Sequence, residues 1–429
     1  MDQDPSIRRL SRVPTPVRRP LELLLFLGTR PEAVKLAPVA LAARRCGGDV
    51  RARLVSSGQH PAAMLEVLED FGLAVDRDLG LFHTGQTPTE VMCAAMAGLD
   101  RELAVRRPDV VLVQGDTTSA LAGALAAFHV GVPVAHVEAG LRSHDRRSPF
   151  PEEMNRRLID AVADVLFAPT PRAERNLLAE GIEPGRVFTT GNTVCDALAA
   201  ALEPGWPTGR RSGGSTGGTG LRQPELDGHA GRVLVTAHRR ESWGEPMDDI
   251  AAAVAAAASR LPAFQFLAPL HPNPQVRRSF LRMPENVVVT DPLPYWTFVR
   301  VLAASDLLVT DSGGALEEAA CLCVPTLVLR RRTERPEALE AGIARLVGTD
   351  REAVARAIER ALSRPGRRRQ APGVFGDGAA GERIVTWLRW SHGLTAHPPA
   401  PFVPLAGTGV RPQGQRTRTW PNWTWASSV

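Results

Sequence analysis

Short apolar runs alternate with longer segments of helical periodicity through the first half of the chain. The apolar runs lie at residues 23–27, 52–55, 110–113, 132–136, 165–168 and 187–189. The helical segments lie at residues 38–43, 62–71, 89–105, 119–128, 155–163 and 171–180. Continuous apolar runs separated by helices are typical of parallel strands that are buried on both faces. The pattern therefore predicts a doubly wound parallel sheet.

A second alternating block follows a segment rich in Gly, Ser and Thr. Its apolar runs lie at residues 233–236, 264–268, 287–290, 307–310, 326–329 and 345–347. Helices are predicted between them, for example at residues 247–259 and 352–363, and a last helix at 382–393. The glycines of SGGSTGGTG follow no predicted strand, which argues against a dinucleotide-binding loop. We interpret this segment as a flexible insertion.

The predicted fold is α/β, with two Rossmann-like doubly wound domains facing a cleft. The expected organisation is a disordered basic tail at 1–20, an N-terminal domain at 21–196, the insertion at 204–231, a C-terminal domain at 232–366, a C-terminal helical segment at 367–393 and a disordered tail at 394–429. In open parallel sheets, ligands bind beyond the carboxyl ends of the strands. Those ends are where candidate site residues are sought.

Composition and charge exclude several classes of protein. The chain is 44% hydrophobic and 23% charged, as in soluble globular proteins. Its formal charge of +5 resides in the two tails, and a nearly neutral body argues against a nucleic-acid-binding domain. No apolar run reaches the length of a membrane span, so we expect no membrane insertion. Five cysteines in mostly apolar settings indicate reduced thiols and a cytoplasmic chain.

The stretch LLVTDSGGALEEA combines an apolar run, a glycine turn and the start of a helix. Ser312, Gly313 and Gly314 would lie at the helix N-terminus, where unpaired N–H groups favour a phosphate. Glu318, one turn further, could accept hydrogen bonds from a pair of sugar hydroxyls. Arg335 in the following TERPE turn could add a positive charge. The alternative is an ordinary glycine-rich turn flanked by surface charges.

Polar residues recur where the predicted strands end. The first domain contributes Arg30, Lys35, Gln59, His60, Asp116, His136, Glu138 and Arg142. The second contributes His238, Arg239, His271, Tyr295 and Phe298. One such residue is more often a cap or a hydrogen-bonding partner than a site residue. Their recurrence at eight strand ends instead favours a shared site.

The candidate site residues of the two predicted domains differ in charge. The first offers the carboxylates Asp116, Glu138 and Glu152, and the second offers His238, Arg335 and the glycine turn. Such a division suits acid–base chemistry on the sugar of a nucleotide sugar, because paired carboxylates can act as base and acid. The alternative for Glu152 is a structural ion-pair network with Glu153 and Arg156.

Several long motifs occur together in one order: GTRPEAVKLAPV, QGDTTSALAGALAAFHVGVPVAHVEAGLRSHDRRSPFPEEMNR, TGNTVCDAL, TAHRRESWG, DSGGALEEA and TERPEALEAG. Over residues 23–350, apart from the insertion, the chain resembles the bacterial non-hydrolysing UDP-N-acetylglucosamine 2-epimerases. The resemblance implies a glycosyltransferase-B-like fold, a last helix that returns to the first domain, and a homodimer. It also implies interconversion of UDP-N-acetylglucosamine and UDP-N-acetylmannosamine without a cofactor or metal. The family's route expels UDP by anti elimination, retains a bound 2-acetamidoglucal and adds UDP back.

The resemblance also assigns roles to individual positions. For the diphosphate it implies Arg30, Lys35, His238, Ser312, Gly313, Gly314 and Arg335. For the ribose it implies Glu318, and for the uracil Phe298 and the backbone of Leu293. Around the reacting sugar it implies Asp116, Glu138 and Glu152, oriented by Arg156, with His238 a further candidate for catalysis. Which carboxylate removes the C2 proton stays open.

Other functions remain compatible with these motifs. A hydrolysing relative would release free N-acetylmannosamine and UDP after the same first half-reaction. A glycosyltransferase would share the fold, since fold does not determine function. A sugar-nucleotide sensor would bind without turnover, although the intact set of carboxylates argues against it.

Many bacterial members of the family bind a second UDP-N-acetylglucosamine beside the active site. The resemblance implies that Gln59, His60, Arg239 and His271 are the possible allosteric residues here. The family's Gln-His-Arg-x segment reads Gln-His-Pro-Ala in this chain, at residues 59–62. Proline lacks a backbone N–H and alanine has no polar side chain. We therefore expect weak or absent allosteric activation.

Overall fold

The computed structural model describes residues 19–59, 61–83, 85–203, 228–239, 242–363 and 373–404. These residues divide into two compact units. Unit 1 comprises described residues up to 199 together with 375–404, and unit 2 comprises those from 200 to 374. Most of the predicted basic tail and insertion, and residues 405–429 of the C-terminal tail, lie outside the described residues.

Unit 1 is built on a seven-stranded parallel sheet in the order β3-β2-β1-β4-β5-β6-β7. Its strands are β1 (Leu21–Leu27), β2 (Val50–Ser56), β3 (Arg77–Asp78), β4 (Val110–Gln114), β5 (Val134–Val137), β6 (Val165–Ala168) and β7 (Val187–Thr189). The chain winds outward from β1 in one direction and then from β4 in the other. This order is that of a Rossmann-like doubly wound sheet, as predicted.

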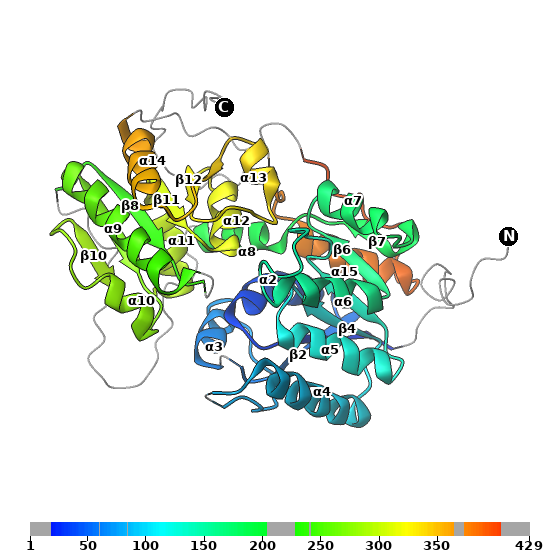
Figure 1. Ribbon diagram of the computed structural model, residues 1–429. Helices are drawn as coiled ribbons and strands as arrows, with labels where there is room; N and C mark the ends of the chain where they lie inside the picture. The colour runs from blue at the N-terminus through cyan, green and yellow to red at the C-terminus, as the bar shows by residue number, and fades with distance from the viewer. Residues whose placement is uncertain are drawn as a thin grey trace. The chain divides into compact units, whose positions relative to one another are not determined.

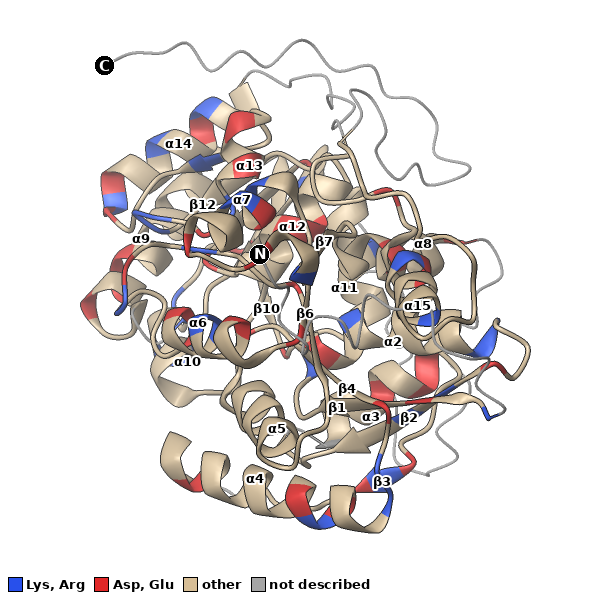
Figure 2. Ribbon diagram, turned by 90° about the vertical axis from the view of Figure 1, so that its right-hand side faces the viewer, with Lys and Arg blue, Asp and Glu red and all other residues tan. Residues whose placement is uncertain are grey.

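The helices that accompany the sheet of unit 1 are labelled in Figure 1. They are α2 (Arg30–Arg44), α3 (Pro61–Asp70), α4 (Pro88–Val105), α5 (Thr118–His129), α6 (Glu152–Val162), α7 (Pro171–Ala179), α8 (Thr193–Leu202) and α15 (Ala380–Ser391). The last three residues of α8 belong to unit 2. Helix α2 packs against α3 and α15, whereas α5 packs against α4 and α6. Leu24 and Phe26 share a buried cluster with α4 and α5. Alternate residues of β1 face the other side of the sheet. Acidic and basic side chains are mixed along α6 (Figure 2).

Helix α2 begins earlier than the sequence pattern indicated. Thr29 is its N-cap, and Glu32 accepts hydrogen bonds from Thr29 N at 2.6 Å and from Gly28 N at 2.7 Å. This arrangement is a capping box, which starts a helix by satisfying its first N–H groups. Pro38 lies inside the helix rather than at its start. The predicted segment at residues 38–43 is therefore only the second half of α2.

Residues after α15 continue in unit 1 up to Pro404. Phe402 is buried, its N–H donates to Thr189 O at 2.8 Å, and its ring lies 5.8 Å from the Arg383 guanidinium carbon. The disordered tail predicted from residue 394 is therefore wrong for residues 394–404. The sequence of this segment is rich in proline and lacks the periodicity of a helix or strand. Its place in unit 1 was therefore not predicted and is known only from its packing against β7.

Unit 2 contains a six-stranded parallel sheet in the order β10-β9-β8-β11-β12-β13. The strands are β8 (Gly231–Thr236), β9 (Phe264–Pro269), β10 (Val287–Thr290), β11 (Leu307–Thr310), β12 (Thr326–Val328) and β13 (Ala344–Leu346). The helices are α9 (Glu245–Arg260), α10 (Pro274–Ser279), α11 (Tyr295–Ala304), α12 (Gly313–Cys321), α13 (Pro336–Glu340) and α14 (Arg351–Ser363). The predicted second Rossmann-like domain is thus confirmed as a parallel α/β unit.

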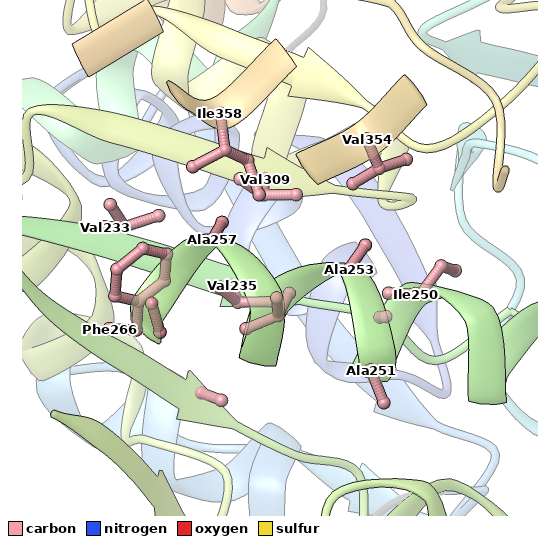
Figure 3. Close-up of a cluster of buried hydrophobic side chains, with 14 of the residues drawn as sticks. Val233, Val235, Ile250, Ala251, Ala253, Ala257, Phe266, Val309, Val354 and Ile358 are labelled. Atoms are coloured by element: carbon pink, nitrogen blue, oxygen red, sulfur yellow. The ribbon is translucent and has the colours of Figure 1, made fainter. Parts of the chain in front are cut away.

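The core of unit 2 packs α9 and α14 on the central strands (Figure 3). Val354 and Ile358 of α14 belong to the same buried cluster as Ala253 and Ala257 of α9. The alanines let the two helices approach closely, while larger side chains such as Phe266 fill the space over the sheet. Within the described residues, no helix is both long and apolar enough to cross a membrane.

Candidate functional site

The glycine turn of unit 2 lies where the sequence placed it. Strand β11 ends at Thr310, Ser312 is the N-cap of α12, and Gly313 and Gly314 are the first helical residues. A Cβ added to Gly314 would meet no atom within 4 Å. The backbone at Gly314 is therefore open to a ligand at the positive end of the helix dipole.

Gly313 is needed for a different reason. A Cβ at this position would lie 2.4 Å from Nη1 of Arg335, so only glycine leaves room for that guanidinium. Arg335 is buried, and its Nε and Nη1 donate to Glu317 and Glu334, each at 2.5 Å. The charge predicted to meet a phosphate is thus partly compensated by two carboxylates, which the sequence pattern did not indicate.

Asp311 joins the ends of β8 and β11. Its carboxylate is completely buried, and Oδ2 accepts hydrogen bonds from the backbone N–H groups of His238 and Arg239, both at 2.9 Å. Its Oδ1 lies 3.6 Å from Nδ1 of His238 and has no hydrogen-bond donor among the described residues. The His238 side chain is 44% exposed, so its Nε2 edge can reach a ligand. The sequence did not predict this role of Asp311, because an Asp before a glycine turn has the appearance of an ordinary turn residue.

The remaining candidates of unit 2 differ in exposure. Glu318, Leu293 and Phe298 are buried, with 8%, 5% and 9% of their surface exposed. Arg239 donates from Nε to the carbonyl oxygen of Asp311 at 3.0 Å, which ties it to the same turn as His238. His271 is exposed, and its Nδ1 accepts a hydrogen bond from Asn273 N at 3.2 Å.

In unit 1, Asp116 follows Gly115 directly after β4. Arg156 of α6 binds its Oδ2 through Nη2 and, at 3.1 Å, through Nε. Asn155 donates to the Asp116 carbonyl oxygen at 2.9 Å. The Arg156 side chain is buried and the Asp116 side chain is 24% exposed, so the carboxylate is fixed in place yet reachable. The predicted pairing of Arg156 with this carboxylate is present.

Glu138, after β5, is held in an unusual conformation. Its φ is 72°, in the left-handed region that costs a non-glycine residue free energy. Its carboxylate forms a buried ion pair with Lys35 of α2, the single lysine of the chain. Asn192 donates to the same Oε2 at 3.1 Å and was not given a role by sequence reasoning, although it stands in the TGNTV motif. Backbone strain and two polar partners at one buried carboxylate are features of a functional site.

Two neighbouring glutamates begin α6, and the structure distinguishes them. Glu152 is partly exposed, whereas Glu153 is completely buried. Glu153 accepts from Arg156 Nη1 at 3.0 Å and from the backbone N–H of Ser143 at 3.0 Å. The ion-pair network that we considered as the alternative therefore involves Glu153. The role of Glu152 at the sugar stays a prediction.

Two further candidates lie near the start of unit 1. Arg30 is the first residue of α2 and is partly exposed. Gln59, beyond β2, accepts a hydrogen bond from Ser119 Oγ at 2.7 Å. His60 lies outside the described residues. In the part of the chain that the structure describes, no cluster of three or more His, Cys, Asp or Glu is placed to hold a metal ion.

Comparison with known proteins identifies the family of this chain. The family profile of UDP-N-acetylglucosamine 2-epimerase matches residues 43–389. The UDP-N-acetylglucosamine 2-epimerase of Bacillus subtilis is 38% identical over 391 residues, covering 89% of this chain and 99% of that protein. A solved structure from Listeria monocytogenes matches with a TM-score of 0.81 at 37% identity, covering 90% of this chain and 99% of its own.

A third relative was solved with a ligand. The UDP-GlcNAc 2-epimerase of Neisseria meningitidis bound to UDP-GlcNAc has a TM-score of 0.74 at 35% identity, covering 85% of this chain and 98% of its own. The two parallel α/β units, together with these relatives, define a Rossmann-type sugar-nucleotide enzyme. More narrowly, the chain belongs to the UDP-N-acetylglucosamine 2-epimerase family.

Proposed function

We propose that this protein interconverts UDP-N-acetylglucosamine and UDP-N-acetylmannosamine by inverting C2, without net hydrolysis. The observation that carries the proposal is the pair of fixed carboxylates in unit 1. Asp116 is bound by Arg156, and Glu138 is bound by Lys35 and Asn192. Inverting a carbon requires a proton to leave one face and return to the other, and two positioned carboxylates supply a base and an acid. Binding of UDP-GlcNAc by the Neisseria relative supports the choice of substrate.

The proposed reaction proceeds through elimination and re-addition. One carboxylate takes the proton from C2, and the electrons of that C–H bond form the C1=C2 double bond. The C1–O bond breaks, and its electron pair leaves with UDP. The second carboxyl group, in its protonated form, then gives its proton to C2 of the 2-acetamidoglucal from the opposite face while a UDP oxygen reforms the bond to C1. The first carboxyl group ends with the proton that the second has lost, and exchange with water restores both. Atoms and charge balance without a further reactant.

Residues of unit 2 are proposed to hold the UDP portion. The N–H groups at Ser312, Gly313 and Gly314 would bind the diphosphate, because a helix N-terminus favours anions. His238 would add a donor that meets the charge growing on the leaving phosphate. Glu318 would bind the ribose hydroxyls. Of the first unit, Arg30 is proposed as a second phosphate contact.

For Lys35 we propose a role that differs from the one implied by the resemblance. The resemblance assigns it to the diphosphate, whereas in this structure its Nζ pairs with the Glu138 carboxylate. An adjacent ammonium stabilises a carboxylate in its charged form. We therefore propose that Lys35 holds Glu138 charged as a base, and that exchange of this contact for a phosphate oxygen accompanies substrate binding.

A hydrolysing epimerase is the principal alternative, because it shares the elimination step. The two are separated by their products. The purified protein is incubated with UDP-N-acetylglucosamine, and the mixture is followed by proton NMR until it stops changing. We expect an equilibrium of two UDP-sugars. Steady accumulation of free N-acetylmannosamine and UDP would instead show hydrolysis.

We also propose, from the resemblance, that the protein acts as a homodimer in the cytoplasm. The five cysteines, all within the described residues, are not joined by disulfides, which suits a reducing compartment. Sedimentation velocity of the purified protein tests the oligomer, with a species of twice the 46.2 kDa chain expected.

A further inference from the structure

A series of ion pairs, in which acidic and basic side chains alternate, begins at Asp116 and includes residues of helix α6. Asp116 binds Arg156, and the Nη1 of Arg156 binds Glu153 at 3.0 Å. Glu153 also accepts from Nε of Arg157 at 3.3 Å. Arg157 then reaches Glu180, at the end of α7, with Nη2 at 3.4 Å from Oε1. Each carboxylate is thus followed by a guanidinium.

The same series of ion pairs continues from Glu180 to a residue of strand β5. Glu180 accepts from Nη2 of Arg142 at 2.6 Å, and this Nη2 also lies 2.7 Å from Asp160 Oδ2. Asp160 Oδ1 lies 2.6 Å from Nδ1 of His136. His136 and Asp160 are both essentially excluded from solvent. The Arg142 side chain is likewise excluded from solvent, so this end of the series is buried.

His136, at the end of this series, contacts the residue that precedes Asp116. Its second ring nitrogen, Nε2, lies 2.8 Å from the carbonyl oxygen of Gly115, the residue immediately before Asp116. The contacts thus form a closed ring that begins and ends at the Gly115–Asp116 turn. The ring contains four carboxylates, three guanidiniums and one imidazole, namely Asp116, Glu153, Glu180, Asp160, Arg156, Arg157, Arg142 and His136.

The contacts of His136 fix its protonation. A backbone carbonyl oxygen can only accept a hydrogen bond. Asp160 Oδ2 lies 2.7 Å from Nη2 of Arg142 and accepts a hydrogen bond from the Gly140 N–H at 3.3 Å, and both contacts stabilise the ionised carboxylate. Asp160 is therefore a carboxylate and also an acceptor. With an acceptor at each nitrogen, the ring donates from both, which only the imidazolium can do.

We propose that His136 is a buried imidazolium that positions the Asp116 carboxylate through the Gly115 carbonyl group. Gly115 has a φ of 70°, so this turn departs from extended backbone just before Asp116. Its N–H donates to Val137 O at 3.0 Å, and its carbonyl oxygen is held by His136. Arg156 fixes the side chain of Asp116, and His136 fixes the backbone from which it projects. This inference rests on the proposed function for its catalytic consequence, but the protonation state stands on the contacts alone.

The first test addresses the protonation state without any turnover. The full chain is labelled with ¹⁵N-histidine, and long-range proton–nitrogen spectra are recorded at pH 7.5. The chain has 10 histidines, so the His136 signals are assigned by their loss in H136Q. We expect both ring nitrogens at shifts typical of protonated imidazolium. One protonated and one unprotonated nitrogen would overturn the proposal.

The second test uses two variants that each keep one of the two contacts. The amide nitrogen of Asn corresponds to Nδ1 and can still donate to Asp160. The amide nitrogen of Gln corresponds to Nε2 and can still donate to Gly115. We expect H136N to lower kcat by roughly 10- to 100-fold, since misplacing a catalytic group by about 1 Å costs that much. H136Q should retain clearly more activity, and KM and UDP affinity should change little in both.

Two outcomes would contradict the positioning role. One is a near-normal kcat in H136N. The other is an equal decrease of kcat in H136N and H136Q that is proportional to the decrease in their stability. E174Q is the control, because Glu174 accepts a partly buried hydrogen bond from Thr189 Oγ1 at 2.7 Å in the same unit but lies outside the ring. If wild-type protein shows no epimerisation, the proposed function fails, whereas the ¹⁵N spectra still decide the state of His136.

Discussion

The two carboxylates of unit 1 are stabilised by different means. Asp116 is partly exposed and is bound by a guanidinium through two nitrogens. Glu138 is buried against an ammonium and an amide. The two carboxyl groups therefore differ in burial and in the kind of cation that they contact. We propose that this difference in surroundings lets one carboxyl group act as the base and the other as the acid.

At this scale the first prediction concerns the reacting carboxylates. D116N and E138Q keep the size of each side chain but remove its ability to exchange a proton. We expect each to slow epimerisation by about 10²-fold or more, the usual contribution of an acid or base. UDP affinity, measured by calorimetry, should be close to that of the wild type.

The matched control is D164N. Asp164 is a carboxylate of the same unit that accepts a hydrogen bond from Val134 N at 2.8 Å and has no proposed part in the reaction. Turnover of D116N and E138Q similar to that of D164N would remove the assigned roles.

The second prediction concerns Glu318. E318A should weaken UDP binding, because each lost charge-assisted hydrogen bond to the ribose costs roughly 1.5–3 kcal/mol. Calorimetric titration with UDP measures the effect. E359A is the comparison, since it removes a carboxylate of α14 whose partner Arg260 is exposed. UDP affinity unchanged in E318A would exclude Glu318 from the nucleotide site.

Among elements, the turn from β11 to α12 could be predicted because three signals agree. The apolar run, the N-cap serine and the paired glycines all point to a strand followed by a helix. The start of α2 was missed because Pro38 suggested a helix N-terminus, while the capping box at Thr29 and Glu32 decides it. Short local patterns are ambiguous when two helix-start signals compete.

The choice between Glu152 and Glu153 shows a similar limit. Glu153, Arg156 and Asp160 are three and four residues apart, so they share one face of α6, and all three are buried. That spacing was readable in the sequence. Which face of α6 points inward depends on packing against α5, and the sequence alone does not fix it.

The third prediction belongs to helix α15. Asp196 accepts hydrogen bonds from the N–H groups of Ala380 and Gly381, at 3.1 and 2.8 Å, at the start of this helix. Burial raises the pKa of Asp196 to about 6. In the unfolded chain this carboxyl loses its proton near pH 4, so between about pH 4 and 6 the folded state binds more protons. The contribution of Asp196 to stability therefore falls as pH rises through that window.

D196N carries no such titration. Between pH 5 and 7 we expect the wild type to lose about 1 kcal/mol more stability than D196N. Urea titrations of both proteins at the two pH values measure this difference. Parallel changes of the two midpoints would show that Asp196 is not linked to folding in this range.

At the scale of the whole molecule, the fourth prediction concerns regulation. The family's activator segment lacks its arginine here, since residues 61 and 62 are Pro and Ala. Losing two polar contacts of about 0.5–1.5 kcal/mol each would weaken activator binding roughly 5- to 150-fold. Starting from pure UDP-N-acetylmannosamine, we expect turnover without a lag and without stimulation by traces of the epimer. A long lag that micromolar UDP-N-acetylglucosamine abolishes would show an intact allosteric site.

The central claim is that C2 loses and regains a proton while UDP departs and returns. Incubation with UDP-N-acetylglucosamine in deuterated water tests it most directly, with proton NMR and mass spectrometry of the recovered sugar nucleotides. We predict UDP-N-acetylmannosamine carrying one solvent deuterium at C2, and the same label entering the remaining substrate as the reaction reverses. An epimer that retains its original hydrogen at C2, or neither exchange nor epimer, would contradict the account.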